Sequence, residues 1–284
     1  MGPDAEASMV ASARDDNVSY FSLLRCAGRC RTTSLSKVLN IGPSPAFLIE
    51  LDAVDLSVDG RDILRGISLA TDARRLGILG RNGSGKTTLA RVLAGLQKPT
   101  GGRVRIAGID VVRDRRGALG AVGILFQNPD HQIIFPTVGE EISFGLAQMG
   151  MIKSEVRNHV AQTLARFGKL AWLEAAIHQL SQGQRQLVCL MAVLAMNPKV
   201  IILDEPFAGL DIPTAMHLSR VLAHANCTLV HITHDPRVIA LYDHALWIEG
   251  GAIAMQGPAA QVAQAFETAM IELGERDDLT DLTG

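Results

Sequence analysis

Short apolar runs alternate with helical patterns from residue 47 onward. Residues 76–79 and 200–203 are continuous apolar runs of strand length, and residues 122–126 and 228–233 form two further predicted strands. Continuous apolar runs are expected for central strands that are buried on both faces of a sheet. The alternation therefore predicts an α/β fold with a mainly parallel sheet covered by helices.

The segment of about residues 127–180 has a helical pattern of its own. Val156, Val160 and Leu164 follow one face of a helix, Ser154 is a suitable N-cap for it, and Gly168 can close it. We expect this segment to be a helical insert within the sheet fold.

The two ends of the chain differ from the rest. Residues 1–46 have no sustained period and finish in a stretch rich in glycine and proline, which predicts a flexible extension. A regulatory arm, or an artefact of the choice of start codon, are alternatives that the sequence leaves open. Residues 263–284 are predicted to be an acidic tail, a fraying helix followed by a solvated end.

Composition and charge exclude several classes of protein. A chain of 284 residues can bury one substantial core, and 27 basic against 29 acidic residues give a net charge of -2. Such a balance creates no strong field for nucleic acid or anionic lipid, so we expect no nucleic-acid partner. No apolar stretch approaches the length of about 18 residues that a membrane span needs, and a secretory signal is lacking, which predicts a cytosolic location.

The four cysteines fit a reducing compartment. Cys189 and Cys227 stand in apolar runs and are interpreted as small buried hydrophobic residues. Cys26 and Cys30 lack a second Cys or His pair that could complete a metal site, so two exposed reduced thiols are expected there.

The first candidate binding site is a glycine-rich loop after the strand 76–79. Its spacing fits the P-loop pattern, with a predicted helix at 88–96 after it, whereas a plain glycine-rich turn would not need these neighbours. Glycines let backbone N–H groups surround a triphosphate, the lysine adds a positive charge, and the threonine hydroxyl can bind Mg²⁺. The predicted nucleotide-binding residues here are Gly80, Arg81, Asn82, Gly83, Ser84, Gly85, Lys86, Thr87 and Thr88.

Two adjacent carboxylates follow the strand 200–203. Asp204 and Glu205 would suffer desolvation and mutual repulsion at the end of a buried strand unless a cation compensated them. Asp204 is therefore predicted to hold Mg²⁺ and Glu205 to act on the attacking water as a base. Two carboxylates that merely cap a turn are the alternative, which a neighbouring P-loop disfavours.

Four motifs then follow in a specific order. They are Leu180-Ser181-Gln182-Gly183-Gln184, Leu203-Asp204-Glu205-Pro206, Ala208-Gly209-Leu210-Asp211 and Thr233-His234-Asp235. In this order they resemble the signature, Walker B, D-loop and switch-histidine motifs of the ATP-binding-cassette (ABC) ATPases. The resemblance covers residues 48–261 and implies one ATPase domain at 47–262, with a RecA-like core, an antiparallel β subdomain before it and a helical subdomain.

The signature motif also has an interpretation from its own chemistry. Ser181 and Gln184 form a predicted capping box, and a capped helix N-terminus that Gly183 leaves open can bind phosphate. The resemblance implies that this site meets ATP held by another subunit, so that two ATP molecules lie in a head-to-tail dimer, which we expect to be a homodimer. Asp211 would then belong to the loop that crosses the dimer interface.

The resemblance assigns further roles to single residues. His234 is implied to contact the γ-phosphate, and Gln127 to sense Mg²⁺, so that Thr87, Gln127 and Asp204 form the predicted metal set with Glu205, His234 and Gln127 as the catalytic set. His231 is interpreted as a packing or polar-network residue, and His159, His224 and His244 as solvated surface.

Two positions depart from the family pattern. Val58 stands where an aromatic residue usually stacks on adenine, which predicts weaker but not absent ATP binding. Gln182 replaces a commoner glycine, and its side chain can lie outside the phosphate path.

Residues 128–142 resemble the matching stretch of energy-coupling-factor importers. In that family the ATPases work with a transmembrane coupling protein and a substrate-binding membrane subunit, which implies peripheral association at the cytoplasmic face of the membrane. Asp130 is expected to meet arginines of the coupling protein, with Ile133, Ile134 and Phe135 as apolar contacts. The implied cargo is a vitamin, first biotin, with cobalt, nickel or another vitamin as alternatives.

A different class stays open, namely a soluble cassette ATPase without a membrane partner. Chromosome and repair versions contain long coiled coils, which the sequence lacks, and translation-type versions have two P-loops where this chain has one. An ATPase of cluster assembly is the remaining alternative.

Overall fold

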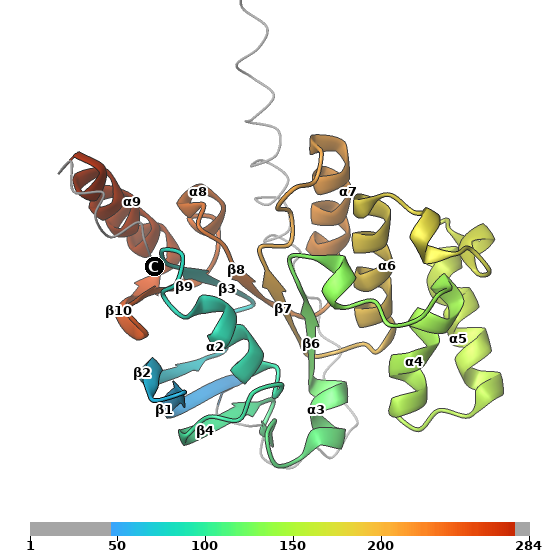
Figure 1. The fold of residues 1–284 in the computed structure, drawn as a ribbon, viewed down its shortest axis with the longest axis horizontal. Coiled ribbons are helices and arrows are strands. Elements are labelled where there is room, and N and C mark those ends of the chain that lie inside the picture. Colours follow the sequence, from blue (N-terminus) through green and yellow to red (C-terminus); the bar gives the residue numbers. More distant parts are fainter. Residues whose placement is uncertain (1–46, 276–284) are drawn as a thin grey trace, which may run out of the picture.

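The structure is a computed structural model that describes residues 47–275. The predicted extension 1–46, with Cys26 and Cys30, and the acidic residues 276–284 lie outside the described residues. Residues 47–275 fold into a larger and a smaller sheet with helices around them (Figure 1).

The larger sheet is mainly parallel, as the apolar runs predict. Its six strands lie in the order β10-β9-β3-β8-β7-β6, with β10 antiparallel to β9 and the other neighbours parallel. Every residue of β7 and β8 is buried, because both faces of the sheet are covered. The strands are β3 (Arg75–Leu79), β6 (Val122–Leu125), β7 (Val200–Asp204), β8 (Thr228–Ile232), β9 (His244–Glu249) and β10 (Ala252–Pro258).

The smaller sheet is antiparallel, which confirms the expected β subdomain. Its order is β2-β1-β4-β5, from β1 (Ile49–Val58), β2 (Arg61–Thr71), β4 (Gly101–Ile106) and β5 (Ile109–Asp110). Asp59 and Gly60 join β1 to β2 and both have a positive φ, of 50° and 77°. Two positive φ values in a two-residue loop are typical of the tight hairpin turn that matches the twist of the strands.

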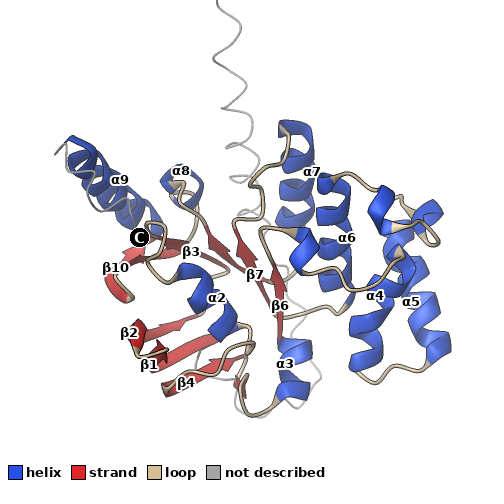
Figure 2. Cartoon of the chain, viewed as in Figure 1, coloured by secondary structure: helices blue, strands red, loops and turns tan. Residues whose placement is uncertain are grey.

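The helices are divided between the two faces of the larger sheet. One face packs Ile78, Ile202 and Val230 against α2 (Lys86–Leu93) and the small sheet. The other packs Ile201, Leu203 and Leu229 against a helical region made of α4 (Val138–Gln148), α5 (Lys153–Arg166), α6 (Gln182–Ala195) and α7 (Ile212–Ala223). In Figure 2, α2 lies beside the small sheet and α4 to α7 lie on the other side of β6 and β7.

The helical region differs from the prediction in two details. α6 packs into the same core as α4 and α5, so this region continues beyond residue 180. Ser154 is not the N-cap of α5: the helix starts at Lys153, and the Glu155 carboxylate accepts a hydrogen bond from the Ile152 N–H at 3.3 Å. Gly168 has φ 65° directly after the C-cap, which confirms that it closes this helix.

The C-terminal helix α9 (Ala259–Glu275) crosses the predicted boundary at residue 263. Val262, Ala263 and Phe266 are buried against Leu79 and Ile239, where Ile239 belongs to α8 (Pro236–Ile239). The start of the predicted tail therefore falls inside a packed helix. None of the helices in the described range 47–275 has the length and apolar character of a membrane span.

The remaining short elements connect these layers. They are α3 (Arg115–Ala121) and three 3₁₀ helices, Pro129–His131, Leu170–Trp172 and Ile177–Gln179. Cys189 and Cys227 are both buried, which confirms their interpretation as core residues.

Candidate active site

The predicted P-loop joins β3 to α2, in the strand, loop and helix order that the motif requires. The helix starts at Lys86 and ends at Leu93, earlier than predicted, so Thr87 and Thr88 lie in its first turn. A Cβ atom on Gly80 would overlap the Ile248 carbonyl oxygen and the Ser84 hydroxyl, and Gly85 has φ 101°. Both positions therefore require glycine.

The loop is folded around its own lysine. The Lys86 ammonium donates hydrogen bonds to the carbonyl oxygens of Gly80 at 2.8 Å and Arg81 at 2.7 Å. Burial lowers the pKa of Lys86, while the nearby carboxylates of Glu205 and Asp204 act in the opposite direction. The Ser84 hydroxyl is buried and has no hydrogen-bond partner among the described residues. An unpaired donor in a glycine-lined loop with a lysine fits an anionic ligand such as a phosphate chain.

Asp204 and Thr87 lie together at the end of β7 and the start of α2. The Thr87 hydroxyl donates to Asp204 Oδ1 at 3.3 Å. Burial raises the pKa of Asp204, the Thr87 hydrogen bond lowers it, and the charge of Glu205 raises it further. Burial and the charge of Glu205 both disfavour the ionised form of Asp204, and a bound cation would offset both effects.

The residues present fit Mg²⁺ as an incomplete ligand set. Within residues 47–275 no three His, Cys, Asp or Glu side chains gather as metal ligands would. Mg²⁺ is usually bound by one or two carboxylates together with phosphate oxygens and water, so one carboxylate and one hydroxyl suffice beside a triphosphate. Gln127, the third predicted ligand, is exposed and its side chain makes no hydrogen bond within the described residues.

The register of the sheet explains where Gln127 lies. Leu125 of β6 pairs with Leu203 of β7. Gln127 comes two residues after Leu125, and Glu205 comes two residues after Leu203. Both residues therefore leave the same edge of a parallel sheet, where ligands of α/β folds bind.

Glu205 is held by the segment that follows β8. Its Oε2 accepts a hydrogen bond from the Thr233 hydroxyl at 3.1 Å, and its Oε1 accepts from the His234 backbone N–H at 2.9 Å and contacts His234 Nδ1 at 2.8 Å. Glu205 also has φ 47°, which is uncommon for a residue with a side chain. The structure thus brings the two predicted catalytic residues Glu205 and His234 together.

The signature segment forms the start of α6. Ser181 accepts from the Gln184 N–H at 3.3 Å, and Gln184 accepts from the Ser181 N–H at 2.9 Å, which confirms the capping box. Both residues are exposed. A Cβ on Gly183 would lie 2.6 Å from Thr214 Cγ2, so glycine lets α6 start close to α7.

One chain does not bring the P-loop and the signature segment together. The α2 helix packs into the core with the small sheet, whereas α6 packs into the core of the helical region. Figure 1 shows α2 and α6 on different sides of β6 and β7.

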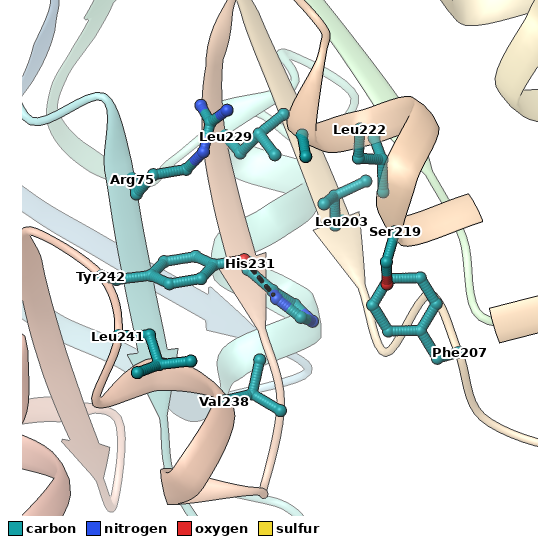
Figure 3. A pocket seen from close by; sticks show the side chains of 11 residues that line it. Arg75, Leu203, Phe207, Ser219, Leu222, Leu229, His231, Val238, Leu241 and Tyr242 are labelled. Atoms are coloured by element: carbon teal, nitrogen blue, oxygen red, sulfur yellow. Dashed lines mark hydrogen bonds between the residues drawn. The ribbon is translucent and has the colours of Figure 1, made fainter. Parts of the chain in front are cut away.

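His231 lies in β8 and lines a small cavity between β8, α7 and α8 (Figure 3). Its Nδ1 lies 2.8 Å from the Tyr242 hydroxyl, and its ring meets Phe207 edge to face at a centroid distance of 5.7 Å. Burial lowers its pKa to about 4, so the imidazole is neutral at pH 7. The structure confirms that His231 is a residue of a buried polar network.

The three histidines predicted to be solvated surface differ from one another. His224 is exposed, as predicted. His159 and His244 are half-buried, and His159 Nε2 lies 3.0 Å from the Ala195 carbonyl oxygen. The prediction of a solvated side chain is therefore wrong for His159 and His244, and the His159 ring is in addition held at the end of α6.

Three further polar side chains near the site were not predicted from the sequence. Gln186 is 1% exposed, and its amide nitrogen donates to the Phe126 carbonyl oxygen at 3.0 Å. Arg185 Nε lies 3.0 Å from Asp130 Oδ1, and the buried Glu141 carboxylate accepts from the N–H groups of Ile134 and Phe135, each at 2.9 Å. For Gln186 a signal exists, since a glutamine within the apolar face of α6 needs buried partners.

This arrangement defines the class of the protein as a P-loop nucleoside triphosphatase, because a glycine-lined phosphate cradle faces carboxylates at the end of a neighbouring parallel strand. Residues 64–208 match the ABC transporter family. The chain belongs to this family and is an ATP-binding and ATP-hydrolysing subunit.

Individual relatives agree with the family. The chain is 47% identical over 222 residues to the biotin transport ATP-binding protein BioM of Rhodobacter capsulatus, covering 78% of this chain and 95% of the relative. It is 34% identical over 244 residues to the energy-coupling factor transporter ATP-binding protein EcfA of Methanothermobacter thermautotrophicus, covering 82% of this chain and 78% of the relative.

Solved structures have the same fold. CbiO1 from Clostridium perfringens, part of the ABC transporter complex CbiONQ, matches with a TM-score of 0.66 at 30% identity, covering 80% of this chain and 95% of that one. The ATP-binding cassette MJ0796, a dimer in a post-hydrolysis state bound to ADP and Pi, matches with a TM-score of 0.64 at 25% identity, covering 74% and 98%.

Proposed function

We propose that this chain powers an energy-coupling-factor importer of biotin. In this proposal two copies form a head-to-tail dimer at the cytoplasmic face of the cell membrane and bind a transmembrane coupling protein and a substrate-binding membrane subunit. The proposal depends on one observation, namely that the two phosphate-binding elements lie in different places on the same chain. Glu205 and Lys86 lie at one edge of the sheet, whereas the phosphate-binding end of α6 is exposed elsewhere on the same chain.

ATP binds along the P-loop. The backbone N–H groups of residues 80–88 surround the phosphates, and Lys86 turns its ammonium from the loop carbonyls toward the β- and γ-phosphates. Thr87, Asp204 and Gln127 would hold Mg²⁺. When bound, Mg²⁺ offsets the negative charge of the phosphate oxygens.

Glu205 acts on the attacking water. An ionised carboxylate has about four lone-pair sites. Because three interactions already use some of them, Glu205 is fixed in place and still has room to accept the proton of a water molecule. His234 is 71% exposed on its side chain, so its ring can turn to the γ-phosphate and stabilise the charge that develops there.

The second copy supplies the other half of each site. The N-terminus of α6 has a partial positive charge, and Ser181 adds a hydroxyl beside it. Exposed Ser181 and Gln184 are available to the phosphates of an ATP held by another chain. This explains why one protomer keeps its two phosphate-binding elements apart. The dimer of the similar cassette MJ0796 supports the arrangement.

Residues 128–142 form the surface for the membrane partner. Ile134 is 68% exposed, and the Phe135 and Phe144 rings pack at a centroid distance of 5.2 Å. Glu141 fixes the backbone of this loop from inside. Exposed apolar groups on a rigid loop are typical of a binding surface. Asp130 adds a negative charge that an arginine of the coupling protein can share with Arg185.

Biotin as the cargo rests on the similarity to BioM, since the ATPase itself does not bind the transported molecule. Cobalt import is the second candidate, as the resemblance to energy-coupling-factor importers implies. CbiO1, part of the ABC transporter complex CbiONQ, is 30% identical to this chain. Nickel or another vitamin follows, as the nickel import protein NikO of Rhodobacter capsulatus is 36% identical.

Purification from membranes tests the whole proposal. We expect the tagged chain to bring down two membrane subunits, to hydrolyse ATP only with Mg²⁺, and to support uptake of labelled biotin in cells that lack their own importer. Uptake of cobalt or nickel instead would correct the cargo. If the chain hydrolyses ATP but no membrane subunit purifies with it from membranes, the importer is contradicted and a cluster-assembly ATPase is favoured.

A further inference from the structure

Gln186 links three segments of the candidate site. It lies in α6 one turn after Gln182, and its buried amide nitrogen donates to the Phe126 carbonyl oxygen at 3.0 Å and to the Pro206 carbonyl oxygen at 3.5 Å. Phe126 directly precedes Gln127, and Pro206 directly follows Glu205. One side chain of the signature helix therefore contacts both catalytic loops of its own chain.

The burial of the Gln186 amide lowers the stability of the folded chain. Gln186 is 1% exposed in an otherwise apolar face of α6, and its Oε1 is buried with no hydrogen-bond partner among the described residues. A buried polar atom without a partner is destabilising, and an apolar side chain of similar size would avoid this penalty. A contribution to stability is therefore a poor explanation for the amide, whereas its two directed hydrogen bonds fix the relative position of the segments.

Neighbouring side chains fasten the same segment to α6. Arg185 Nε lies 3.0 Å from Asp130 Oδ1, and the Cys189 thiol lies 4.0 Å from the Pro129 carbonyl oxygen. Residues 126–130 are thus attached to α6 at three points. These contacts tie the backbone before and after Gln127 to the position of α6.

We propose that Gln186 is a positioning residue that couples the two ATP sites of the dimer. The inference rests on the proposed head-to-tail dimer, in which residues 181–184 of this chain contact the partner's ATP while Gln127 and Glu205 act on its own. Gln186 then aligns Gln127 and Glu205 when α6 engages the partner's nucleotide. Gln186 itself touches neither ATP nor the reacting atoms.

Gln186→Leu tests the coupling, because leucine removes both hydrogen bonds and the unpartnered oxygen together. We expect kcat to fall about tenfold, the effect of losing roughly one hydrogen bond in the transition state. The KM for ATP should stay within about twofold, since no ATP contact is removed. The Hill coefficient for ATP, which cannot exceed about two for two sites, should fall toward one.

Two further variants separate positioning from folding. Gln186→Glu keeps the shape but removes the amide donors and sets a carboxylate against two carbonyl oxygens, so a larger loss of kcat than in Gln186→Leu is expected. Val193→Ala, at a buried position of the same helix, opens a cavity without touching these hydrogen bonds. It should lower the melting temperature yet keep the Hill coefficient of the parent.

The outcomes distinguish this inference from the proposed function. A cooperative parent with an equally cooperative Gln186→Leu variant overturns the coupling role alone. The same holds if Val193→Ala loses cooperativity as much as Gln186→Leu does. A parent that hydrolyses ATP without cooperativity and stays monomeric when Glu205 is changed to Gln overturns the dimer, and the coupling with it.

Discussion

The two phosphate-binding elements of the chain are held in opposite ways. In the P-loop half, Lys86 is 8% and Asp204 is 5% exposed, and each contacts other residues of the site. In the signature segment, Ser181 and Gln184 are exposed and contact mainly each other. The first half is organised by its own chain. The second half is a prepared surface whose ligand comes from outside.

This difference indicates how the work is divided. Reactive groups that need fixed positions are placed where the sheet determines their geometry, at the ends of β7 and β8. A helix terminus needs no such framework, because its backbone N–H groups bind phosphate wherever the helix is presented. Substitutions in the two halves should therefore fail in different ways.

Glu205→Gln should give the largest effect. Glutamine keeps an oxygen that accepts hydrogen bonds but cannot take a proton, so hydrolysis should fall by about 10² to 10⁴-fold. ATP binding should persist, and the dimer should accumulate in size-exclusion chromatography with ATP. Phosphate release measures the rate, and Glu267→Gln on the exposed face of α9 serves as the matched control. Turnover at the parent rate would refute the role of Glu205.

A mixture of two defective variants tests whether two chains form a common ATP site, and it should give the next largest effect. Lys86→Ala disables the P-loop half, and Ser181→Glu places a negative charge where phosphate is expected at the start of α6. Each alone should be nearly inactive. In an equimolar mixture half of the dimers contain both chains and each of these has one intact composite site, so at most about a quarter of the parent rate should return.

Lys86→Ala and Ser181→Glu should carry different affinity tags, which provide the control for this mixture. Pull-down through one tag establishes that mixed dimers form. If mixed dimers form but hydrolyse ATP no faster than the two single variants do, the P-loop of one chain and the signature segment of the other do not form a common site.

The sequence predicts the P-loop half well because its signals are local. A loop of fixed spacing between strand and helix, and two carboxylates after an apolar run, each define their own geometry. The C-terminal end of the chain is harder to predict. The acidic residues Glu272 and Glu275 favour a solvated end, whereas Val262 and Phe266 pack α9 onto the core.

Contacts between distant residues could not be predicted. Asp130 and Arg185 lie far apart in sequence, and only the packing of α6 brings them to 3.0 Å. The start of α5 shows a closer competition, since Ser154 is a good cap by type but the Glu155 carboxylate satisfies the backbone N–H of Ile152, before the helix reaches Ser154. Here two local caps compete within a few residues, and residue preference alone does not decide between them.

His231, in the strand β8 that leads to Thr233 and His234, tests whether buried contacts organise this part of the sheet. Because burial lowers its pKa from 6.5 to about 4, the unfolded chain takes up a proton before the folded chain as the pH falls. This contribution to stability is complete above pH 6.5 and is lost progressively down to about pH 4, at about 1.4 kcal/mol per pH unit and about 3 kcal/mol in all.

We expect His231→Phe to remove this part of the pH dependence, whatever its stability at pH 7. Urea unfolding at pH 7 and at about pH 4.5 measures it as a difference from the parent. Tyr242→Phe is the matched control, because it removes the hydroxyl partner and keeps the buried imidazole. Equal pH dependence in His231→Phe and the parent would contradict a neutral buried histidine.

Val58→Tyr should give the smallest effect and concerns a contact that the P-loop half lacks. Val58 is 40% exposed at the end of β1, beside the turn of Asp59 and Gly60, so a larger ring can be accommodated there. Stacking on a base contributes about 1 to 3 kcal/mol, so the dissociation constant for ATP should fall about tenfold in an equilibrium titration. Val58→Leu adds apolar area without an aromatic face and should change it little. If tyrosine and leucine act alike, adenine does not lie over residue 58, and the P-loop half binds ATP through its phosphates alone.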